Sequence, residues 1–212
     1  MSETVKITID GREISAPAGE KLLWVALENG IYIPHLCAIK ENHKPFASCR
    51  LCFVEVEGYP RPVTSCTEAV REGLVVVTRS PLLDRLVQTG FEMLMSNHRI
   101  ECKACPANGS CALQKIAKER KWRLKPRRLP ALERELPVDD TAPNVIYDPN
   151  KCVLCGQCVW ACRQAGSGTL GFAHRGFDRL MTTFGGAPLG DSDCGDCSAC
   201  AGACPVGALS AK

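Results

Sequence analysis

Alternating apolar and polar side chains at the start of the chain predict a β-hairpin followed by a helix. Residues 5–9 place Val and Ile at every second position, and the Asp10-Gly11 pair that follows is a tight-turn signal. Residues 19–29 then place Leu and Ala at the spacing of an amphipathic helix, which Gly30 ends. We therefore expect two antiparallel strands and one short helix.

Two later apolar runs predict the rest of a small sheet. Residues 53–57 and 74–77 are rich in Val, a side chain that favours strands. A hairpin, a helix and returning strands describe a β-grasp domain over residues 1–79. The loop over residues 37–52 would wrap a bound group.

A helical module is predicted over residues 80–119. Ser80 and Pro81 are a helix start, with Ser as the N-cap and Pro at the first helical position, and apolar residues continue at helical spacing to about residue 97. A second, shorter helix is expected later in the module. His98 falls where the first helix ends, so its side chain can turn toward the loop that follows.

The chain then changes character before a C-terminal repeat. Residues 120–144 hold four prolines among charged side chains, a composition typical of a linker or of an arm that wraps a partner. Residues 145–212 contain two runs of the form Cys-x2-Cys-x2-Cys-x3-Cys, a repeat of the bacterial ferredoxin type. The predicted fold class is therefore α+β, with a ferredoxin-like domain at the C-terminal end.

Cysteine carries the chemistry of this chain. Fifteen cysteines and one histidine divide into four sets of four. An iron–sulfur cluster takes four protein ligands, mostly thiolates, so the four sets predict one [2Fe–2S] and three [4Fe–4S] clusters. In chain order the sets are Cys37, Cys49, Cys52 and Cys66; His98, Cys102, Cys105 and Cys111; Cys152, Cys155, Cys158 and Cys162; and Cys194, Cys197, Cys200 and Cys204.

The two C-terminal runs predict a pair of [4Fe–4S] clusters that exchange one ligand. In two-cluster ferredoxins the fourth cysteine of each run binds the other cluster. Structural zinc instead favours separated pairs of cysteines, not four within eleven residues. One departure from the ferredoxin pattern is Arg163, which follows Cys162 where a proline follows Cys204. The expected sets are Cys152, Cys155, Cys158 and Cys204, and Cys194, Cys197, Cys200 and Cys162.

The first two sets are less regular. Eleven residues separate Cys37 from Cys49 where plant-type [2Fe–2S] proteins have four, and by composition alone this set could be a zinc site. Its β-grasp context and the neighbouring motifs favour a [2Fe–2S] cluster. His98 is expected to bind a [4Fe–4S] cluster because it completes a fourth ligand for three cysteines. The other histidines are expected at the surface or in the core: His35, His43 and His174.

Composition limits the compartment and the partners. An odd number of cysteines and an N-terminus without an apolar core argue against a secreted disulfide scaffold, so the cytoplasm is expected. No apolar run approaches the ~20 residues of a membrane span. The formal net charge of +3 becomes roughly −4 once four clusters add about −7. The eight Lys and Arg of residues 115–128 are therefore expected to face solvent or a partner protein, not nucleic acid.

The order of these motifs resembles a known family over nearly the whole chain. It is similar to the N-terminal region of the large iron–sulfur subunit of respiratory complex I and of multi-domain [FeFe] hydrogenases, and to the small diaphorase subunit of NAD-reducing [NiFe] hydrogenases. Phe172–Phe177 followed by Phe184-Gly185 looks most like the diaphorase and hydrogenase branch, and the chain length favours the stand-alone diaphorase subunit. The other segments that carry the resemblance are Ala47–Val56, Asn97–Gln114 and Lys151–Cys158.

The resemblance implies an electron-transfer subunit without catalytic residues. It implies a flavin- and NAD(H)-binding partner on one side and a catalytic partner on the other, most closely a hydrogenase. A formate dehydrogenase or an electron-bifurcating complex uses similar parts, and a free-standing polyferredoxin is the rival class. Residues 166–171 match Gly-x-Gly-x-x-Gly, but they follow no predicted strand, so no nucleotide site is expected there.

Overall fold

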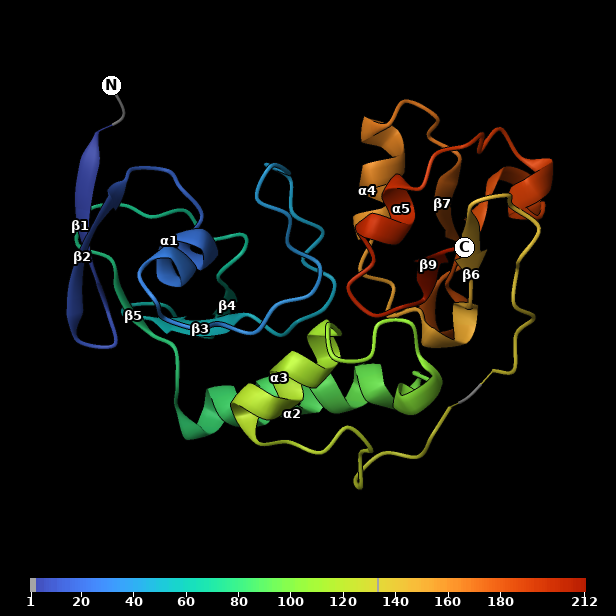
Figure 1. The fold of residues 1–212 in the computed structure, drawn as a ribbon. Helices are drawn as coiled ribbons and strands as arrows, with labels where there is room; N and C mark the ends of the chain where they lie inside the picture. Colours follow the sequence, from blue (N-terminus) through green and yellow to red (C-terminus); the bar gives the residue numbers. More distant parts are fainter. Residues whose placement is uncertain (1–2, 133) are drawn as a thin grey trace. The chain divides into compact units, whose positions relative to one another are not determined.

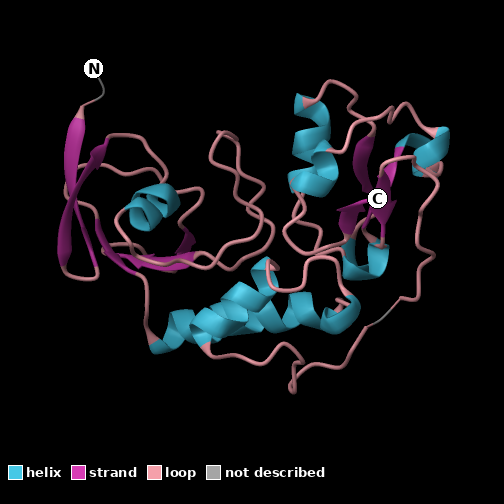
Figure 2. Ribbon diagram, in the orientation of Figure 1, coloured by secondary structure: helices cyan, strands magenta, loops and turns pink. Residues whose placement is uncertain are grey.

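The computed structural model describes residues 3–132 and 134–212. It divides into two compact units, one ending at Phe91 and the other beginning at Glu92. The boundary falls inside the long helix α2 (Pro81–Ser96). Figure 1 shows the order of the elements along the chain, and Figure 2 shows how much of the chain lies in loops.

The first unit is built on one five-stranded sheet. Its strand order is β2-β1-β5-β3-β4, with β1 and β5 parallel and the other neighbours antiparallel. In chain order the elements are β1 (Thr4–Ile9), β2 (Arg12–Pro17), α1 (Leu22–Glu28), β3 (Phe53–Val56), β4 (Val63–Thr64) and β5 (Val75–Val77). This arrangement confirms the β-grasp prediction, to which the structure adds the short strand β4.

The hairpin forms because its turn accepts a left-handed backbone. Asp10 and Gly11 both have positive φ, 49° and 78°, as a two-residue turn between antiparallel strands requires. Ile7 then pairs with Ile14 and Val5 with Ala16, so that one face of the hairpin is apolar. The apolar face packs with α1 in a core that includes Ile7, Ile9, Leu22, Leu23, Val54 and Val76.

Helix α2 begins where the sequence predicts. The Leu83 amide donates to the Ser80 hydroxyl oxygen over 3.2 Å, which is an N-cap contact, and Pro81 occupies the first helical position. Within the first unit, Gly90 lies against the loop that carries Cys49 and Cys52. A Cβ at this position would stand 3.2 Å from the Arg50 carbonyl oxygen, so glycine permits the close approach.

The second unit combines short helices with two small sheets. Strands β6 (Val145–Tyr147) and β9 (Leu209–Ala211) pair antiparallel, and β7 (Leu170–Ala173) and β8 (Leu180–Thr183) form a hairpin. Helices α4 and α5 lie side by side (Figure 1). The helices are α3 (Ala112–Arg120), α4 (Gln157–Gln164) and α5 (Ala199–Gly202), with 3-10 turns η1 (Cys102–Ala104), η2 (Pro149–Lys151), η3 (Gly176–Asp178), η4 (Phe184–Gly186) and η5 (Leu189–Asp191). The α+β fold class is confirmed.

Residues 120–144 were expected to be a linker or an arm. Arg120 ends α3, and we call residues 121–144 the strap. The described residues of the strap form no helix or strand, but hydrogen bonds and an ion pair hold the strap against the rest of the second unit. Arg128 pairs with Glu92 at 2.7 Å, and the Leu132 amide donates to the Ser96 carbonyl oxygen. The Asn150 side-chain amide also exchanges two hydrogen bonds of 2.8 Å with the backbone of Leu136. The strap is therefore part of the folded unit.

No helix in the described ranges is both long enough and apolar enough to cross a bilayer.

Candidate iron–sulfur cluster sites

The first cysteine set lies together in the first unit. Cys37, Cys49, Cys52 and Cys66 are all buried. The loop between them bends through left-handed backbone at Ala47 and Arg50, with φ of 49° and 55°, which is uncommon outside glycine. This bend brings the Sγ atoms of Cys37 and Cys49 to 3.4 Å from each other.

Two of these four thiols are biased toward the thiolate form. A hydrogen bond from the Cys49 thiol lowers the pKa of Cys37 to about 5, and a hydrogen bond from Cys52 lowers the pKa of Cys66. The Cys49 amide also donates to Cys37 Sγ over 3.5 Å. Because the thiolate is the form that binds metal, the loop is arranged to support anionic sulfur.

His98 is held in the form that a metal needs. Its side chain is 8% exposed, and its Nδ1 lies 2.9 Å from the Lys151 carbonyl oxygen. A carbonyl oxygen only accepts, so Nδ1 carries the proton and Nε2 keeps its lone pair. Burial lowers the pKa of His98, which favours the neutral imidazole. Nε2 is therefore the nitrogen that can bind iron.

The three cysteines of the His98 set come from the turn η1 and the start of α3. Cys102 and Cys105 are half-buried and Cys111 is buried, where burial raises the pKa of its thiol. This module packs against the segment after Cys204: the Ala112 amide donates to the Pro205 carbonyl oxygen over 2.9 Å. A Cβ built on Gly207 would stand 2.9 Å from Cys105 Sγ, so glycine is required there.

The third group of cysteines surrounds one apolar cavity. Cys152, Cys155, Cys158 and Cys204 line it, and no cysteine of the other sets does. The remaining lining is mainly apolar and includes Phe172, Met181 and Leu209. Burial raises the pKa of Cys152 to about 11. Cys204, the last cysteine of the second run, thus lies with the first three cysteines of the other run.

Backbone amides point at these sulfur atoms. The Leu154 amide lies 3.5 Å from Cys152 Sγ, and the Leu209 amide lies 3.4 Å from Cys204 Sγ. Leu154 reaches this position with a φ of +53°, an outlier for a bulky residue. Hydrogen bonds to cluster sulfurs raise reduction potentials, so these amides lie where they would stabilise negative charge on a bound cluster.

The fourth group mirrors the third. Helix α4 carries Cys162 and packs against α5, which carries Cys200, and both cysteines belong to one buried cluster. Burial, followed by negative charge on Cys194 and Cys162, raises the pKa of Cys200 to about 11. The structure therefore brings Cys162 to the second run, as it brings Cys204 to the first. Cys197 is exposed to solvent.

The donor sets fit polynuclear clusters. All fifteen cysteines lie in the described ranges and are free thiols. Within those ranges no three His, Cys, Asp or Glu side chains come close enough to hold a single metal ion. A mononuclear zinc site needs four ligands about 2.0–2.3 Å from one ion. In a cubane each ligand binds a different iron, whereas in a [2Fe–2S] cluster two thiolates share each iron, which suits the close pair of Cys37 and Cys49.

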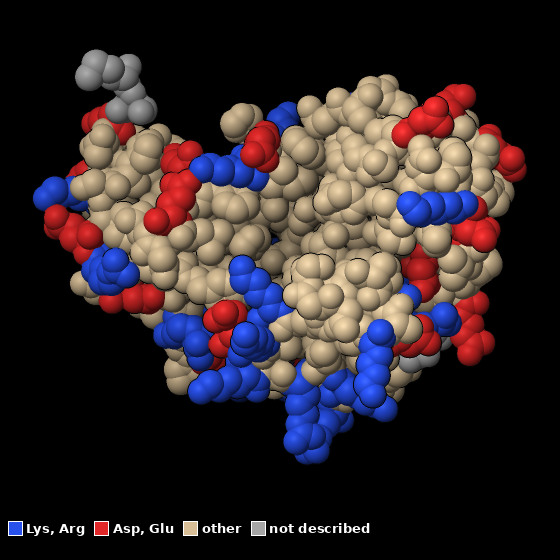
Figure 3. Space-filling model, viewed as in Figure 1, with Lys and Arg blue, Asp and Glu red and all other residues tan. Residues whose placement is uncertain are grey.

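The glycine-rich segment 166–171 and the basic residues of 115–128 lie outside the cysteine sets. Residues 166–171 follow α4 and include the first two residues of β7. Strand β7 pairs antiparallel with β8, so no parallel βαβ unit surrounds these glycines. Lys and Arg side chains gather over α3 and the strap (Figure 3). Exposed members of this group include Lys118, Lys121, Arg123, Lys125 and Arg127.

Sequence reasoning missed the groups that support the cysteines. The Lys151 carbonyl and the amides of Leu154 and Leu209 are backbone atoms, which no residue pattern reveals. Arg134 is a strap residue whose guanidinium contacts the β7–β8 hairpin. The sequence did not single it out as a site residue, because it is one of many charged residues in a Pro-rich segment.

Three family profiles match the chain in the order of its predicted domains. Residues 2–81 match a 2Fe-2S iron-sulfur cluster binding domain. Residues 88–122 match the NADH-ubiquinone oxidoreductase-G iron-sulfur binding region, and residues 145–164 match a 4Fe-4S binding domain. Iron–sulfur domains of both cluster types are therefore present.

Curated relatives are similar over nearly the whole chain. The NADPH-Fe(3+) oxidoreductase subunit alpha of Geobacter sulfurreducens is 35% identical over 98% of this chain and 24% of its own length. The NADP-reducing hydrogenase subunit HndD of Solidesulfovibrio fructosivorans is 35% identical over 96% of this chain and 35% of its own length. The mitochondrial NADH-ubiquinone oxidoreductase 78 kDa subunit of Neurospora crassa is 34% identical over 98% and 28%. The chain spans about a quarter to a third of these relatives.

A solved structure matches at closer to full length. One chain in the crystal structure of an NAD+-reducing [NiFe]-hydrogenase superposes with a TM-score of 0.89 and 34% identity, covering 98% of this chain and 87% of that one. The chain therefore belongs to the family of iron–sulfur proteins that includes this hydrogenase chain and the corresponding region of the NADH-ubiquinone oxidoreductase 78 kDa subunit.

Proposed function

We propose that the four sets hold one [2Fe–2S] and three [4Fe–4S] clusters. The [2Fe–2S] cluster binds Cys37, Cys49, Cys52 and Cys66, and one cubane binds His98, Cys102, Cys105 and Cys111. The two C-terminal cubanes exchange ligands, one binding Cys152, Cys155, Cys158 and Cys204 and the other Cys194, Cys197, Cys200 and Cys162. The cavity lined by Cys152, Cys155, Cys158 and Cys204 is the observation that carries this assignment, because it joins cysteines from two distant runs.

The chemistry of such clusters is one-electron transfer. In each set all four positions are protein side chains, so no iron keeps an open position of the kind that a catalytic metal site needs. The residues have three roles around the clusters. Thiolates bind iron, His98 supplies a neutral ligand, and backbone amides such as that of Leu154 stabilise negative charge on sulfur. We infer a role in electron transfer without catalysis.

In this role the chain carries electrons between a flavin- and NAD(H)-binding subunit and a catalytic subunit in the cytoplasm. The relatives are named as oxidoreductases of NADPH, NADP or NADH, and the matched structure is an NAD+-reducing [NiFe]-hydrogenase, so we propose a hydrogenase as the catalytic partner. A formate dehydrogenase or an electron-bifurcating complex is the alternative within the same class. A free-standing polyferredoxin is the alternative outside it.

Iron and sulfide analysis tests the cluster assignment. Protein purified without oxygen should contain about fourteen irons per chain, from two in one [2Fe–2S] cluster and four in each of three cubanes. A value of about ten would remove one cubane, and one or two zinc ions with little iron would refute the assignment.

Purification of the native protein from its own cell tests the partners. A subunit should elute with a flavoprotein and should bring bound flavin with it. Elution as a single polypeptide without flavin would support the free polyferredoxin. Nickel in a third polypeptide would then identify a [NiFe]-hydrogenase, whereas iron alone would leave the other catalytic partners open.

A further inference from the structure

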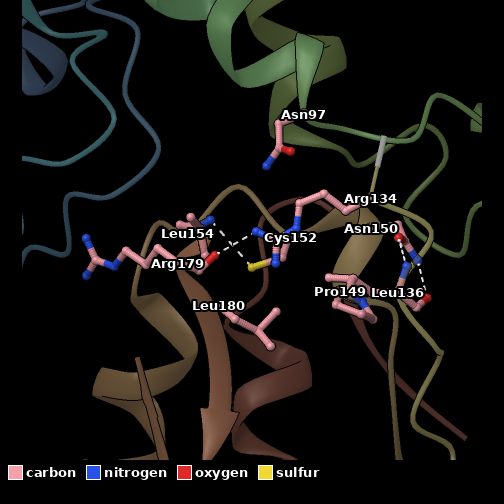
Figure 4. A pocket seen from close by; sticks show the side chains of 9 residues that line it. All are labelled: Asn97, Arg134, Leu136, Pro149, Asn150, Cys152, Leu154, Arg179 and Leu180. Atoms are coloured by element: carbon pink, nitrogen blue, oxygen red, sulfur yellow. Dashed lines mark hydrogen bonds between the residues drawn. The ribbon is translucent and has the colours of Figure 1, made fainter. Parts of the chain in front are cut away.

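A small cavity in the second unit joins the strap to the Cys152 cluster site. Figure 4 shows Cys152 at this cavity with Arg134 from the strap and Arg179 from the β7–β8 hairpin. Asn97, the neighbour of His98 in the chain, lines the same cavity. The cavity therefore lies beside a proposed cluster ligand and next to the end of α2.

Arg134 is held in place by the backbone of the hairpin. Its Nη1 donates to the Phe177 carbonyl oxygen over 2.8 Å and to the Arg179 carbonyl oxygen over 3.0 Å. Both acceptors are neutral, so these bonds orient the guanidinium without cancelling its charge. The described carboxylates next to these arginines in the chain, Glu135 and Asp178, are exposed, where solvent screens them.

The charge of Arg134 reaches Cys152. Arg134 and Cys152 line the same cavity, so the guanidinium lies beside this proposed cluster ligand. Cys152 also lines the cavity of the proposed cluster, so it stands between that site and Arg134. Arginine stays protonated in proteins, so the charge is permanent.

We propose that Arg134 sets the reduction potential of the cluster bound by Cys152, Cys155, Cys158 and Cys204. This inference rests on the proposed cluster. Reduction adds a negative charge to a group that is already anionic, and a fixed cation beside it stabilises the reduced form, because net charge and hydrogen bonds set cluster potentials. The strap thus supplies a functional group and does more than connect two modules.

The other C-terminal cubane site provides an internal comparison. Its second run stands among Asp191, Asp193 and Asp196, and Cys197 is exposed. Nearby carboxylates disfavour the negative charge that reduction adds to a cluster, whereas a fixed cation favours it. Arg134 is therefore expected to make the Cys152 cluster the more easily reduced of the two.

Three variants of the full chain test the proposal. Arg134→Gln removes the charge and keeps a donor for the hairpin carbonyls, and Arg134→Lys keeps the charge. Arg127→Gln removes an exposed charge from the same strap and serves as the control. Redox titration followed by EPR measures each cluster, and a Cys155→Ser variant identifies the signal of the Cys152 cluster.

The midpoint potential of the Cys152 cluster should fall in Arg134→Gln and stay at the wild-type value in Arg134→Lys and Arg127→Gln. The potential of the Cys194 cluster should stay unchanged in all three. Loss of the cubane in Arg134→Gln with a wild-type potential in Arg134→Lys would also support a need for the charge. An unchanged potential in Arg134→Gln, or loss of the cubane from both Arg134 variants, would overturn the proposal. Wild-type protein without this cluster would instead refute the proposed function.

Discussion

Replacing Gly207 by alanine should disrupt the His98 cluster from outside its ligand set. Gly207 has a φ of +70°, and a Cβ there would lie 2.8 Å from Ala107 Cβ and 2.9 Å from Cys105 Sγ. Contacts below 3.0 Å force a neighbour to move, and one of these neighbours is a proposed iron ligand. The variant therefore changes the position of Cys105 without changing its chemistry.

Two costs add up in this variant. Left-handed backbone costs a residue with a Cβ about 1–2 kcal/mol. Overpacking a close-packed site costs typically ~1–3 kcal/mol. Together Gly207→Ala should destabilise the second unit by about 2–5 kcal/mol, with the larger share falling on the contact between Gly207 and Cys105.

Gly185→Ala is the matched control. Gly185 has the same φ of +70°, and its Cβ would meet no atom within 4 Å, so this variant carries the backbone cost alone. Thermal unfolding followed by loss of cluster absorbance measures stability, and EPR measures the occupancy of the His98 cluster. Gly207→Ala should lose stability and the His98 signal, whereas Gly185→Ala should lose a smaller amount of stability and keep the signal. Equal effects of the two variants would refute a role for the Cys105 contact.

Three further variants test the ligand sets and the local electrostatics. Cys162→Ser should damage the cubane held by the second cysteine run, and a structure of this variant should show which cubane has lost its ligand. Damage to the cubane of the first run would contradict the exchange of ligands. His98→Cys should lower the potential of its cluster, because thiolate is anionic and imidazole neutral; an unchanged EPR signal and potential would remove His98 from the ligand set. Asp148→Asn should cost about 3 kcal/mol by leaving Lys151, its partner at 3.0 Å, buried without a counter-charge. Burial alone would raise the pKa of Asp148, but hydrogen bonds from Asn150 and Lys151 outweigh it and lower the pKa, so Asp148 stabilises the fold fully above the pKa of the unfolded carboxyl and less as the pH falls. Chemical denaturation should show this loss of stability at low pH in wild type and not in Asp148→Asn. Glu13→Gln, at an exposed ion pair, is the control and should change stability by about zero.

The local elements could be predicted where a single segment decides its own structure. The hairpin turn at Asp10-Gly11 and the helix start at Ser80-Pro81 follow from backbone preferences of those residues, and both occur in the structure. Strands β6 and β9 could not be found in this way. They are three residues each and pair across more than sixty residues, so their partners and not their own sequences make them strands.

The strap shows the same limit at the level of a segment. Its prolines and charges are typical of a linker, and its described residues have no helix or strand. What fastens it are single contacts such as Arg128 with Glu92 and Leu136 with Asn150. Such contacts depend on tertiary placement, which composition does not encode. For the same reason the cysteine spacing predicted the ligand sets but could not predict that Arg134 lies beside Cys152.

The uneven burial of the cysteines determines how this protein ages in air. Among the fifteen cysteines, all within the described part of the chain, Cys197 is the exposed one, and those of the first set are buried. Sulfur oxidation follows thiolate character and exposure, so we expect oxygen to attack the proposed Cys197 cubane before the proposed β-grasp cluster. A partner protein that covers Cys197 would therefore protect the proposed cubane from oxygen.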